Sequence, residues 1–237
     1  MFAKSSAASF LEHLQAACQR PVTMPVFLEG YAAVLAGVSA SGRYQLHGLT
    51  IDSPAGVYSP HETSSTRAVM DRFFALGLTE RCGRLLEVGC GAGAISLLAA
   101  KHGWQVSAGD IDPAAVRATR HNAQLNGLEV NARESDLCAA FVDEKFDVIL
   151  FNQPFFHLDR ETREDERTLS DFGGQIYVRF MEEARKLLTP GGYVIIAYAN
   201  CSNLEIFNQP GWAMELRAFD FDAGANYIRA LFIARPA

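Results

Sequence analysis

The sequence predicts an α/β fold in which a doubly wound, largely parallel sheet carries helices on both faces. Apolar runs of strand type alternate with segments of helical composition, as residues 85–88 and 94–101 do. Three glycines stand between those two segments and indicate a tight turn from strand to helix. Two alternating runs, 212–221 and 227–234, end the sequence and are typical of a β-hairpin. Strands that alternate with helices and end in a hairpin form a mixed sheet.

Length and composition predict one main domain. The chain has 237 residues, 49% of them hydrophobic, which is enough to bury one sizeable core. We expect an N-terminal extension over residues 1–55, made of two helices and a strand or hairpin, before a main domain over 56–237. The net charge of −6 and the pI near 5.5 leave no basic surface for a phosphate backbone. This balance disfavours a large nucleic-acid substrate.

Cysteine usage and the lack of long apolar runs predict a cytoplasmic protein. The five cysteines are odd in number and lack metal-ligand spacing, so we expect reduced thiols and no bound metal. The first residues lack the basic start and apolar core of a signal peptide, and no apolar run reaches the ~18 residues of a membrane span. The oligomeric state stays open, a homodimer included.

The extension and the segment after it supply the first expected elements. Helices are expected at residues 9–20 and 25–35. Residues 43–51 are typical of a strand, in which the apolar alternation slips by one at His47-Gly48, as a β-bulge would make it. A turn and residues 57–63 then lead into a helix. Its predicted core-facing side chains are Val69, Met70, Phe73 and Phe74.

Gly89, Gly91 and Gly93 form the candidate ligand-binding turn. Glycine has no side chain to block positive φ or to keep a ligand from the backbone, and N–H groups at the start of the next helix face whatever binds there. The following strand ends in Asp110, about twenty residues beyond Gly89, where a carboxylate can accept both hydroxyls of a ribose. The spacing predicts a nucleoside cofactor, although the glycines alone also suit a turn without a ligand.

The glycine spacing selects among nucleoside cofactors. Dinucleotide folds place the third glycine three residues after the second, whereas Gly93 follows Gly91 by two and Glu87 precedes Gly89 by two. An acidic entrance suits a cationic amine better than a phosphate. On this acidic-x-Gly-x-Gly-x-Gly motif the chain resembles the class I S-adenosylmethionine-dependent methyltransferases, from about Val57 onward. The resemblance implies S-adenosylmethionine as cofactor and a Rossmann-like sheet of seven strands, with only the last antiparallel.

The resemblance also implies the cofactor contacts. After the next helix, for which Asp112 is a predicted N-cap, and a short strand at 130–133, these enzymes have an acidic residue that accepts a bond from the adenine amine. Asp136 stands at that place, and a plain turn residue is the alternative. The predicted cofactor-binding residues are Glu87, Gly89, Cys90, Gly91, Gly93, Asp110, Ile111, Asp136, Leu137 and Asn152.

The catalytic stretch is predicted at Asn152-Gln-Pro-Phe155, directly after the buried strand 146–151. Ligands of parallel sheets bind at the carboxyl ends of strands. The stretch resembles the Asn/Asp-Pro-Pro-Tyr/Phe motif of amino methyltransferases of the small-domain group, which methylate planar nitrogens. Gly56, Val57, Tyr58 and Pro60 match a second pattern of these enzymes. Tyr58 and His61 are therefore candidate site walls, and a solvent-exposed helix start is the alternative for His61.

The predicted catalytic residues Asn152, Gln153, Pro154 and Phe155 would act chiefly by orientation. A nitrogen held by two acceptors points its lone pair toward the methyl group, and Asn152 Oδ1 and the carbonyl of residue 153 would be those acceptors. Phe155 would stack on the flat acceptor group and exclude water. Gln153 departs from the motif, where proline is expected, and so leaves the acceptor undetermined.

The remaining segments complete the sheet. Residues 159–167 are all charged except Thr162 and predict either a solvated loop or a mobile lid before Gly173-Gly174. A helix is expected at 175–188, a turn at 189–192 and a buried strand at 193–199.

Three functions fit these observations. The first is a nitrogen methyltransferase acting on a small molecule or a protein side chain. The second is a methyltransferase for an RNA base amine. The third is an enzyme that uses S-adenosylmethionine without transferring its methyl group, for instance by intramolecular cyclisation. The intact Asn152, Pro154 and Phe155 argue against a fourth function, a cofactor-binding protein without activity.

Overall fold

The computed structural model describes residues 41–61, 64–79, 82–158, 170–200, 202, 204–207, 209–222 and 227–237. The helices predicted at 9–20 and 25–35 and the charged segment 159–167 lie outside these ranges.

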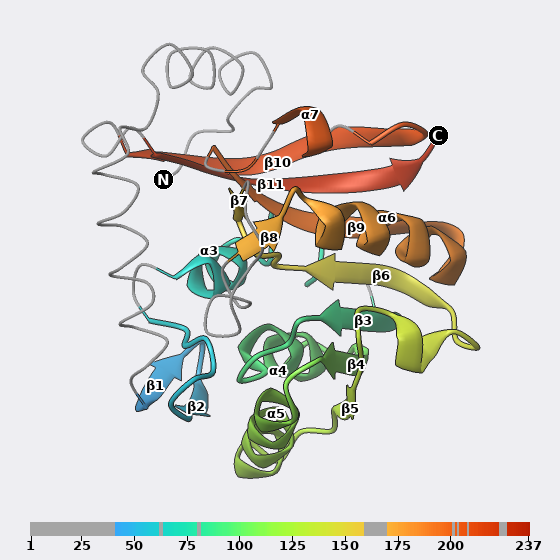
Figure 1. Cartoon of the computed structure of the whole chain (residues 1–237). Helices are drawn as coiled ribbons and strands as arrows, with labels where there is room; N and C mark the ends of the chain where they lie inside the picture. Colours follow the sequence, from blue (N-terminus) through green and yellow to red (C-terminus); the bar gives the residue numbers. More distant parts are fainter. Residues whose placement is uncertain are drawn as a thin grey trace.

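A seven-stranded sheet forms the centre of the described structure, in the order β10-β11-β9-β6-β3-β4-β5 (Figure 1). Its strands are β3 (Arg84–Val88), β4 (Gln105–Asp110), β5 (Asn131–Glu134), β6 (Phe146–Phe151), β9 (Leu188–Ala199), β10 (Trp212–Asp222) and β11 (Tyr227–Pro236). Five strands pair in parallel, whereas β11 is antiparallel to both of its neighbours, β9 and β10. The predicted seven-stranded sheet, with only its last strand antiparallel, is confirmed.

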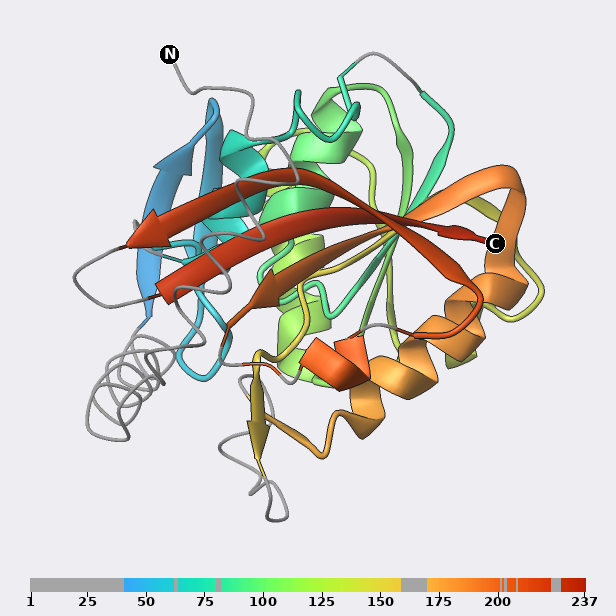
Figure 2. The same cartoon turned by 90° about the horizontal axis from the view of Figure 1, so that it is seen from above.

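Helices cover both faces of the sheet because its central strands are apolar on both sides. Leu85, Val148 and Ile195 belong to one buried cluster, and the next residue of each strand belongs to another. This alternation follows from the pleat, which points successive side chains to opposite faces. α6 packs on one face, and α3, α4 and the hairpin β1–β2 pack on the other (Figure 2). The helices are α3 (Ser65–Asp71), α4 (Ala94–Lys101), α5 (Pro113–Leu125), α6 (Gln175–Leu187), α7 (Leu204–Phe207) and the 3₁₀ helix η1 (Ala139–Phe141).

The segment expected as one bulged strand is a hairpin of β1 (Gly42–Leu46) and β2 (Leu49–Ser53). His47 and Gly48 connect the two strands, and both have positive φ, at 50° and 69°. A two-residue turn with positive φ at both positions suits the twist of a hairpin. The bulge was therefore a wrong interpretation, because a slip in alternation also arises when the chain reverses.

Smaller differences concern single elements. The strand expected at 130–133 begins and ends one residue later, and the turn expected at 189–192 is the irregular start of β9, where the register with β6 shifts. Phe74 was predicted to face the core but is 71% exposed, beyond the end of α3. Two short parallel strands, β7 (Phe156–Leu158) and β8 (Ser170–Phe172), were not predicted. The predicted N-cap is confirmed, since Asp112 accepts a bond from Ala114 N.

Candidate active site

Three predicted stretches meet at the carboxyl ends of adjacent strands. Gly89–Gly93 follows β3, Asp110 ends β4, and Asn152 follows β6. These strands are neighbours in the order β6-β3-β4 and run parallel. A direct contact joins two of the stretches, because Gly91 N donates to Asp110 Oδ2 at 2.9 Å. The candidate site therefore lies at the sheet edge where parallel α/β folds bind ligands.

The glycine turn has backbone angles that favour glycine, and at Gly93 it leaves no room for a side chain. Gly91 and Gly93 have φ of 53° and 80°. A Cβ on Gly93 would lie 2.8 Å from Thr119 Oγ1, whereas a Cβ on Gly91 would have Tyr58 O at 3.5 Å as its nearest neighbour. Tyr58, a predicted wall, thus lies over Gly91, and α5 supports the turn below Gly93. Because Gly91 and Gly93 carry no side chains, their backbone atoms are open to a ligand.

Asp110 is anchored while part of its carboxylate remains able to accept bonds. Its Oδ2 accepts from Gly91 N, and its Oδ1 accepts from Asp112 N at 3.0 Å. Burial raises the pKa of Asp110, and these backbone bonds oppose the rise. Each carboxylate oxygen has two lone pairs, so both oxygens retain acceptor capacity. Ile111, the next predicted contact, exposes 55% of its surface beside this carboxylate.

Glu87 is buried beneath the turn rather than standing at its entrance. Its side chain is 2% exposed, and its Oε2 accepts from Ser96 N at 2.8 Å and from the Ser96 hydroxyl. Burial raises the pKa of Glu87 to about 8. Glu87 therefore fastens the first turn of α4 to the end of β3, and in this way it shapes the glycine turn from below.

Cys90 is part of the wall behind the turn. Its N–H donates to Gly109 O at 3.0 Å, and its thiol lies 3.4 Å from Thr119 Oγ1. Burial raises the pKa of Cys90 well above its ordinary value, so the thiol stays protonated and is no nucleophile. Thr119 Oγ1 also donates to Gly91 O at 3.0 Å, which ties the turn to α5.

Asp136 and Leu137 lie in a tight turn after β5. Leu137 is buried, has a φ of 49°, and accepts a bond from Ser135 Oγ at 2.8 Å. Asp136 is exposed, and its Oδ1 pairs with Arg179 Nη2 at 2.5 Å. This ion pair with α6 is a partner that the sequence did not indicate. A role for Asp136 in binding adenine would have to accommodate Arg179.

The side-chain amide of Asn152 has hydrogen-bond partners for its nitrogen and, among the described residues, none for its oxygen. Its Nδ2 donates to Ser65 Oγ at 3.0 Å and to Thr66 Oγ1 at 3.3 Å, both on α3. Its Oδ1 is buried and has no hydrogen-bond partner within the part of the chain that the structure describes. A buried acceptor without a partner costs about 1–3 kcal/mol, so such atoms in native structures call for a ligand or other explanation.

The rest of the catalytic stretch packs against β9. Gln153 is 3% exposed, and its Nε2 donates to Ala197 O at 3.1 Å. Pro154 and Phe155 are half-buried, and Phe155 O accepts from Ser202 Oγ at 2.8 Å. Phe155 lines a shallow hollow that is partly open to solvent. The hollow lies between α3 and the strands β10 and β11, and the ion pair of Arg72 with Asp220 lies in its wall.

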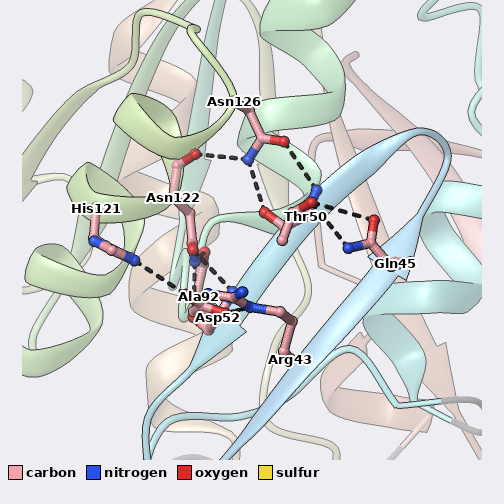
Figure 3. A network of polar contacts seen from close by, with 8 residues as sticks. All are labelled: Arg43, Gln45, Thr50, Asp52, Ala92, His121, Asn122 and Asn126. Carbon is pink, nitrogen blue, oxygen red and sulfur yellow. Dashed lines mark hydrogen bonds and ion pairs between the residues drawn. The ribbon is translucent and has the colours of Figure 1, made fainter.

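Asn122 in α5 and Asn126 at its C-cap attach the hairpin to the site (Figure 3). Asn122 receives a bond from Asp52 N and donates to Asp52 O, and Asn126 makes the same pair of bonds with Thr50. Asn122 Nδ2 also donates to Ala92 O in the glycine turn at 2.8 Å. Residues Thr50 and Asp52 are two apart in β2, and the asparagines are four apart at the C-terminal end of α5. The two asparagine side chains therefore supply hydrogen-bond partners to the backbone N–H and C=O groups of β2.

Sequence reasoning missed four residues that hold the site: Ser65, Thr66, Thr119 and Asn122. Serine and threonine before an apolar run indicate only a helix start, and Ser64 is indeed the N-cap of α3. Asparagine is a weak helix former, so Asn122 inside a helix was a usable signal for a specific polar contact.

Within the described residues, no helix combines the length and apolar character needed to cross a membrane. Over the same residues, no three His, Cys, Asp or Glu side chains gather as metal ligands would.

Comparisons with known proteins find methyltransferases. The family model of the methyltransferase small domain matches residues 48–208. The chain is 39% identical over 118 residues to a putative protein N5-glutamine methyltransferase of Methanocaldococcus jannaschii, covering 47% of this chain and 59% of that protein. It is 32% identical over 155 residues to the ribosomal RNA small subunit methyltransferase C of Chromohalobacter salexigens, covering 65% and 43%. The chain thus spans less than two thirds of these relatives.

A solved structure with a similar fold is the T. thermophilus 16S rRNA N2 methyltransferase in complex with AdoMet and guanosine. The TM-score is 0.64 at 22% identity, and the match covers 84% of this chain and 50% of that one. At this identity the likeness supports the fold alone.

Proposed function

The chain belongs to the methyltransferase small-domain family, and from this premise we propose that it transfers a methyl group from S-adenosylmethionine to a planar nitrogen of a small molecule or a protein side chain. The observation that carries the proposal is Asn152, whose buried Oδ1 lacks a partner among the described residues while its Nδ2 is held by α3. An amide fixed by its nitrogen presents its oxygen as an acceptor, and an N–H group of the substrate would complete it.

The residues at the sheet edge fit this cofactor. The turn at Gly91 and Gly93 leaves bare backbone that a Cβ would fill, and Asp110 retains acceptor capacity for ribose hydroxyls. Cys90, Gly89 and Leu137 would shape the cradle, Ile111 would offer an apolar contact, and Glu87 would hold the turn from below. S-adenosylmethionine supplies an electrophilic methyl group on a sulfonium.

The chain's own residues would supply orientation more than proton transfer. Asn152 Oδ1 and the carbonyl of residue 153 would accept the two N–H groups of one amine, which aims the lone pair of that nitrogen along the remaining direction. Phe155, half-buried beside Asn152, would stack on the flat group and exclude water. Orientation of this kind contributes roughly 7–11 kcal/mol in well-aligned systems.

The relatives support nitrogen as the methylated atom. One of them is named as a putative protein N5-glutamine methyltransferase. A primary amide has the flat geometry and the two N–H donors that Asn152 and its neighbours would bind. The acidic net charge of −6 also favours a small molecule or a protein over a phosphate backbone.

A second candidate is an RNA base amine. It is favoured by the ribosomal RNA methyltransferase among the relatives. An exocyclic base amine is also planar and would satisfy the same two acceptors. Binding of RNA that weakens steeply as salt rises would support this candidate.

Product analysis tests the proposal. The purified chain is incubated with S-adenosylmethionine carrying a labelled methyl group, in the presence of the protein, the small-molecule or the RNA fraction of a cell extract. Mass spectrometry then identifies the nucleoside product and the labelled acceptor. We expect S-adenosylhomocysteine and a labelled nitrogen in the protein or small-molecule fraction. Methylthioadenosine without a labelled acceptor would contradict methyl transfer, and label in RNA alone would select the second candidate.

A further inference from the structure

β6 ends before β9 does, and this leaves a gap in the sheet at the candidate site. The last matched pair of the two strands is Phe151 with Ile196, whereas β9 continues to Ala199 and pairs there with β11 on its other side. The first carbonyl of β9 beyond the matched pairs, that of Ala197, accepts a bond from Gln153 Nε2 at 3.1 Å. A side-chain amide thus takes the place of the next backbone amide of β6.

Burying the amide of Gln153 costs desolvation free energy, which its bond to Ala197 O would have to offset. The side chain is 3% exposed, so water does not compete for its contact with Ala197. Its Oε1 is buried and finds no hydrogen-bond partner in the described ranges. An apolar side chain of similar size would avoid the desolvation of Oε1. Glutamine therefore contributes a donor that an apolar residue cannot supply.

The catalytic stretch is fastened at three points, and Gln153 is the middle one. Asn152 Nδ2 is held by Ser65 and Thr66 on α3, and Phe155 O is held by Ser202 after β9. The bond from Gln153 to β9 follows directly after Asn152. It fixes both the carbonyl of residue 153 and the backbone that carries the Asn152 side chain.

We infer that Gln153 is a positioning residue, whose bond to the Ala197 carbonyl aims Asn152 Oδ1 and its own main-chain carbonyl at the methyl acceptor. The inference rests on the proposed function. Proline, which stands here in the motif Asn-Pro-Pro-Tyr/Phe, fixes its own φ and restricts the preceding residue to extended conformations. In this chain a tether to the neighbouring strand performs the task that ring rigidity performs in the motif.

The test compares two substitutions of Gln153. Gln153→Met keeps the length of the side chain and removes the donor, so Asn152 Oδ1 should no longer be held in the orientation that binds the methyl acceptor. Gln153→Pro also removes the donor, but the proline ring makes the backbone rigid. This variant should therefore keep most of the order and the activity that Gln153→Met loses. The control is Tyr177→Phe, which deletes another buried bond from a side chain to the main chain, from Tyr177 Oη to Phe207 O on the far side of the core.

Two measurements separate positioning from general stability. In the absence of cofactor, hydrogen exchange at the amides of Asn152 and Phe155 should become about tenfold faster in Gln153→Met, the equivalent of one hydrogen bond, and stay near wild type in Gln153→Pro. With cofactor and acceptor, kcat should fall about a hundredfold in Gln153→Met, with an unchanged dissociation constant for S-adenosylmethionine. Gln153→Pro should restore most of this loss. Tyr177→Phe should leave kcat and both exchange rates unchanged.

Wild-type exchange and wild-type kcat in Gln153→Met would overturn the inference. So would a Gln153→Pro variant that is folded and as impaired as Gln153→Met, because backbone rigidity at residue 153 would then not replace the bond. If wild-type protein methylates no acceptor, the proposed function fails by itself. The exchange comparison uses no cofactor, and in that case it decides separately whether Gln153 holds the stretch.

Discussion

Asn122 on α5 and Asp52 on β2 form a closed pair of hydrogen bonds: Asp52 N donates to Asn122 Oδ1 at 2.9 Å, and Asn122 Nδ2 donates to Asp52 O at 2.8 Å. Asn122 is fully buried, and the same Nδ2 donates to Ala92 O in the glycine turn. One side chain therefore connects the hairpin β1–β2 with the candidate cofactor cradle. Asn126 makes the matching pair with Thr50 but has no contact with the turn in the described structure.

This difference predicts separate effects of two similar substitutions. Asn122→Ala should lower the free energy of unfolding by about 2–4 kcal/mol, because it leaves several buried backbone groups unpaired. It should also weaken S-adenosylmethionine binding, since Ala92 O loses its donor. Asn126→Ala should destabilise the fold without changing cofactor affinity. Urea unfolding and calorimetry measure the two quantities, and equal cofactor affinities in both variants would contradict a link between hairpin and turn.

Gly93 should be the least replaceable glycine of the turn. Its φ is 80°, and an alanine Cβ would lie 2.8 Å from Thr119 Cγ2 and Oγ1. Gly127 also has positive φ, at 63°, but a Cβ there would meet nothing within 4 Å. Gly127→Ala should therefore cost only the backbone strain of about 1–2 kcal/mol, and Gly93→Ala should cost more.

A double variant isolates the steric part. Thr119→Ala removes the two nearest of the three atoms that the new Cβ would meet and leaves Leu97 Cδ1 at 3.0 Å, so Gly93→Ala should cost less free energy of unfolding in a Thr119→Ala background than in wild type. Additive effects of the two substitutions would show that the contact with Thr119 contributes nothing to the cost of Gly93→Ala.

Glu87 should make the stability of the protein depend on pH. Burial raises its pKa in the folded protein from an ordinary 4.5 to about 8. Between these values the folded state holds a proton that the unfolded state has released, so the free energy of unfolding should fall as pH rises. The slope should reach at most about 1.4 kcal/mol per pH unit and vanish above about pH 8.

Glu87→Gln provides the reference, because glutamine does not titrate and can still accept from Ser96. The difference in unfolding free energy between wild type and this variant, measured at about pH 5, 6.5 and 8.5, should change in favour of the variant as pH rises. A constant difference over this range would mean that Glu87 does not hold its proton across this window.

Asp110 and Asp136 should contribute unequally to cofactor binding. Asp110→Ala should weaken S-adenosylmethionine binding about ten- to a hundredfold, the loss expected for charge-assisted bonds to ribose. Asp136→Ala should have a smaller effect, because Asp136 is exposed and already paired with Arg179. Calorimetry measures the affinity of both variants for S-adenosylmethionine and shows which substitution weakens it more. Unchanged affinity in Asp110→Ala would remove its assignment to the ribose.

Asn152→Ala should lower turnover by several orders of magnitude and change cofactor affinity little, as expected for an interaction made chiefly in the transition state. Ser65→Ala is the graded comparison, because it removes one bond that holds Nδ2 but leaves Oδ1 in place. Its loss of turnover should be smaller. An Asn152→Ala variant with wild-type turnover and weakened cofactor binding would place Asn152 in the cradle instead.

The sheet and the edge that holds the site could be predicted because their signals are local. β3 and β6 are short apolar runs, and the glycines, Asp110 and Asn152 stand at or directly after the ends of neighbouring strands. The hairpin turn at His47-Gly48 was missed because a reversal and a bulge leave the same one-residue slip in the apolar pattern.

Contacts between distant side chains could not be predicted in this way. The pairs Arg179 with Asp136 and Gln153 with Ala197 join residues more than forty positions apart, and their register depends on how β6, β9 and α6 pack. Glu87 looked like an accessible charge because a sequence motif does not show depth, and the structure buries it against Ser96.

The place of β11 sets the order in which this sheet can be assembled. β10 precedes β11 in the chain, yet among the described strands it pairs with β11 alone, which separates it from β9. Until residues 227–236 are available, β10 has no strand to join and β9 offers an open edge to any other extended chain. Protein synthesis therefore produces a stage at which the nascent chain is vulnerable to aggregation, and docking of the β10–β11 hairpin ends that stage.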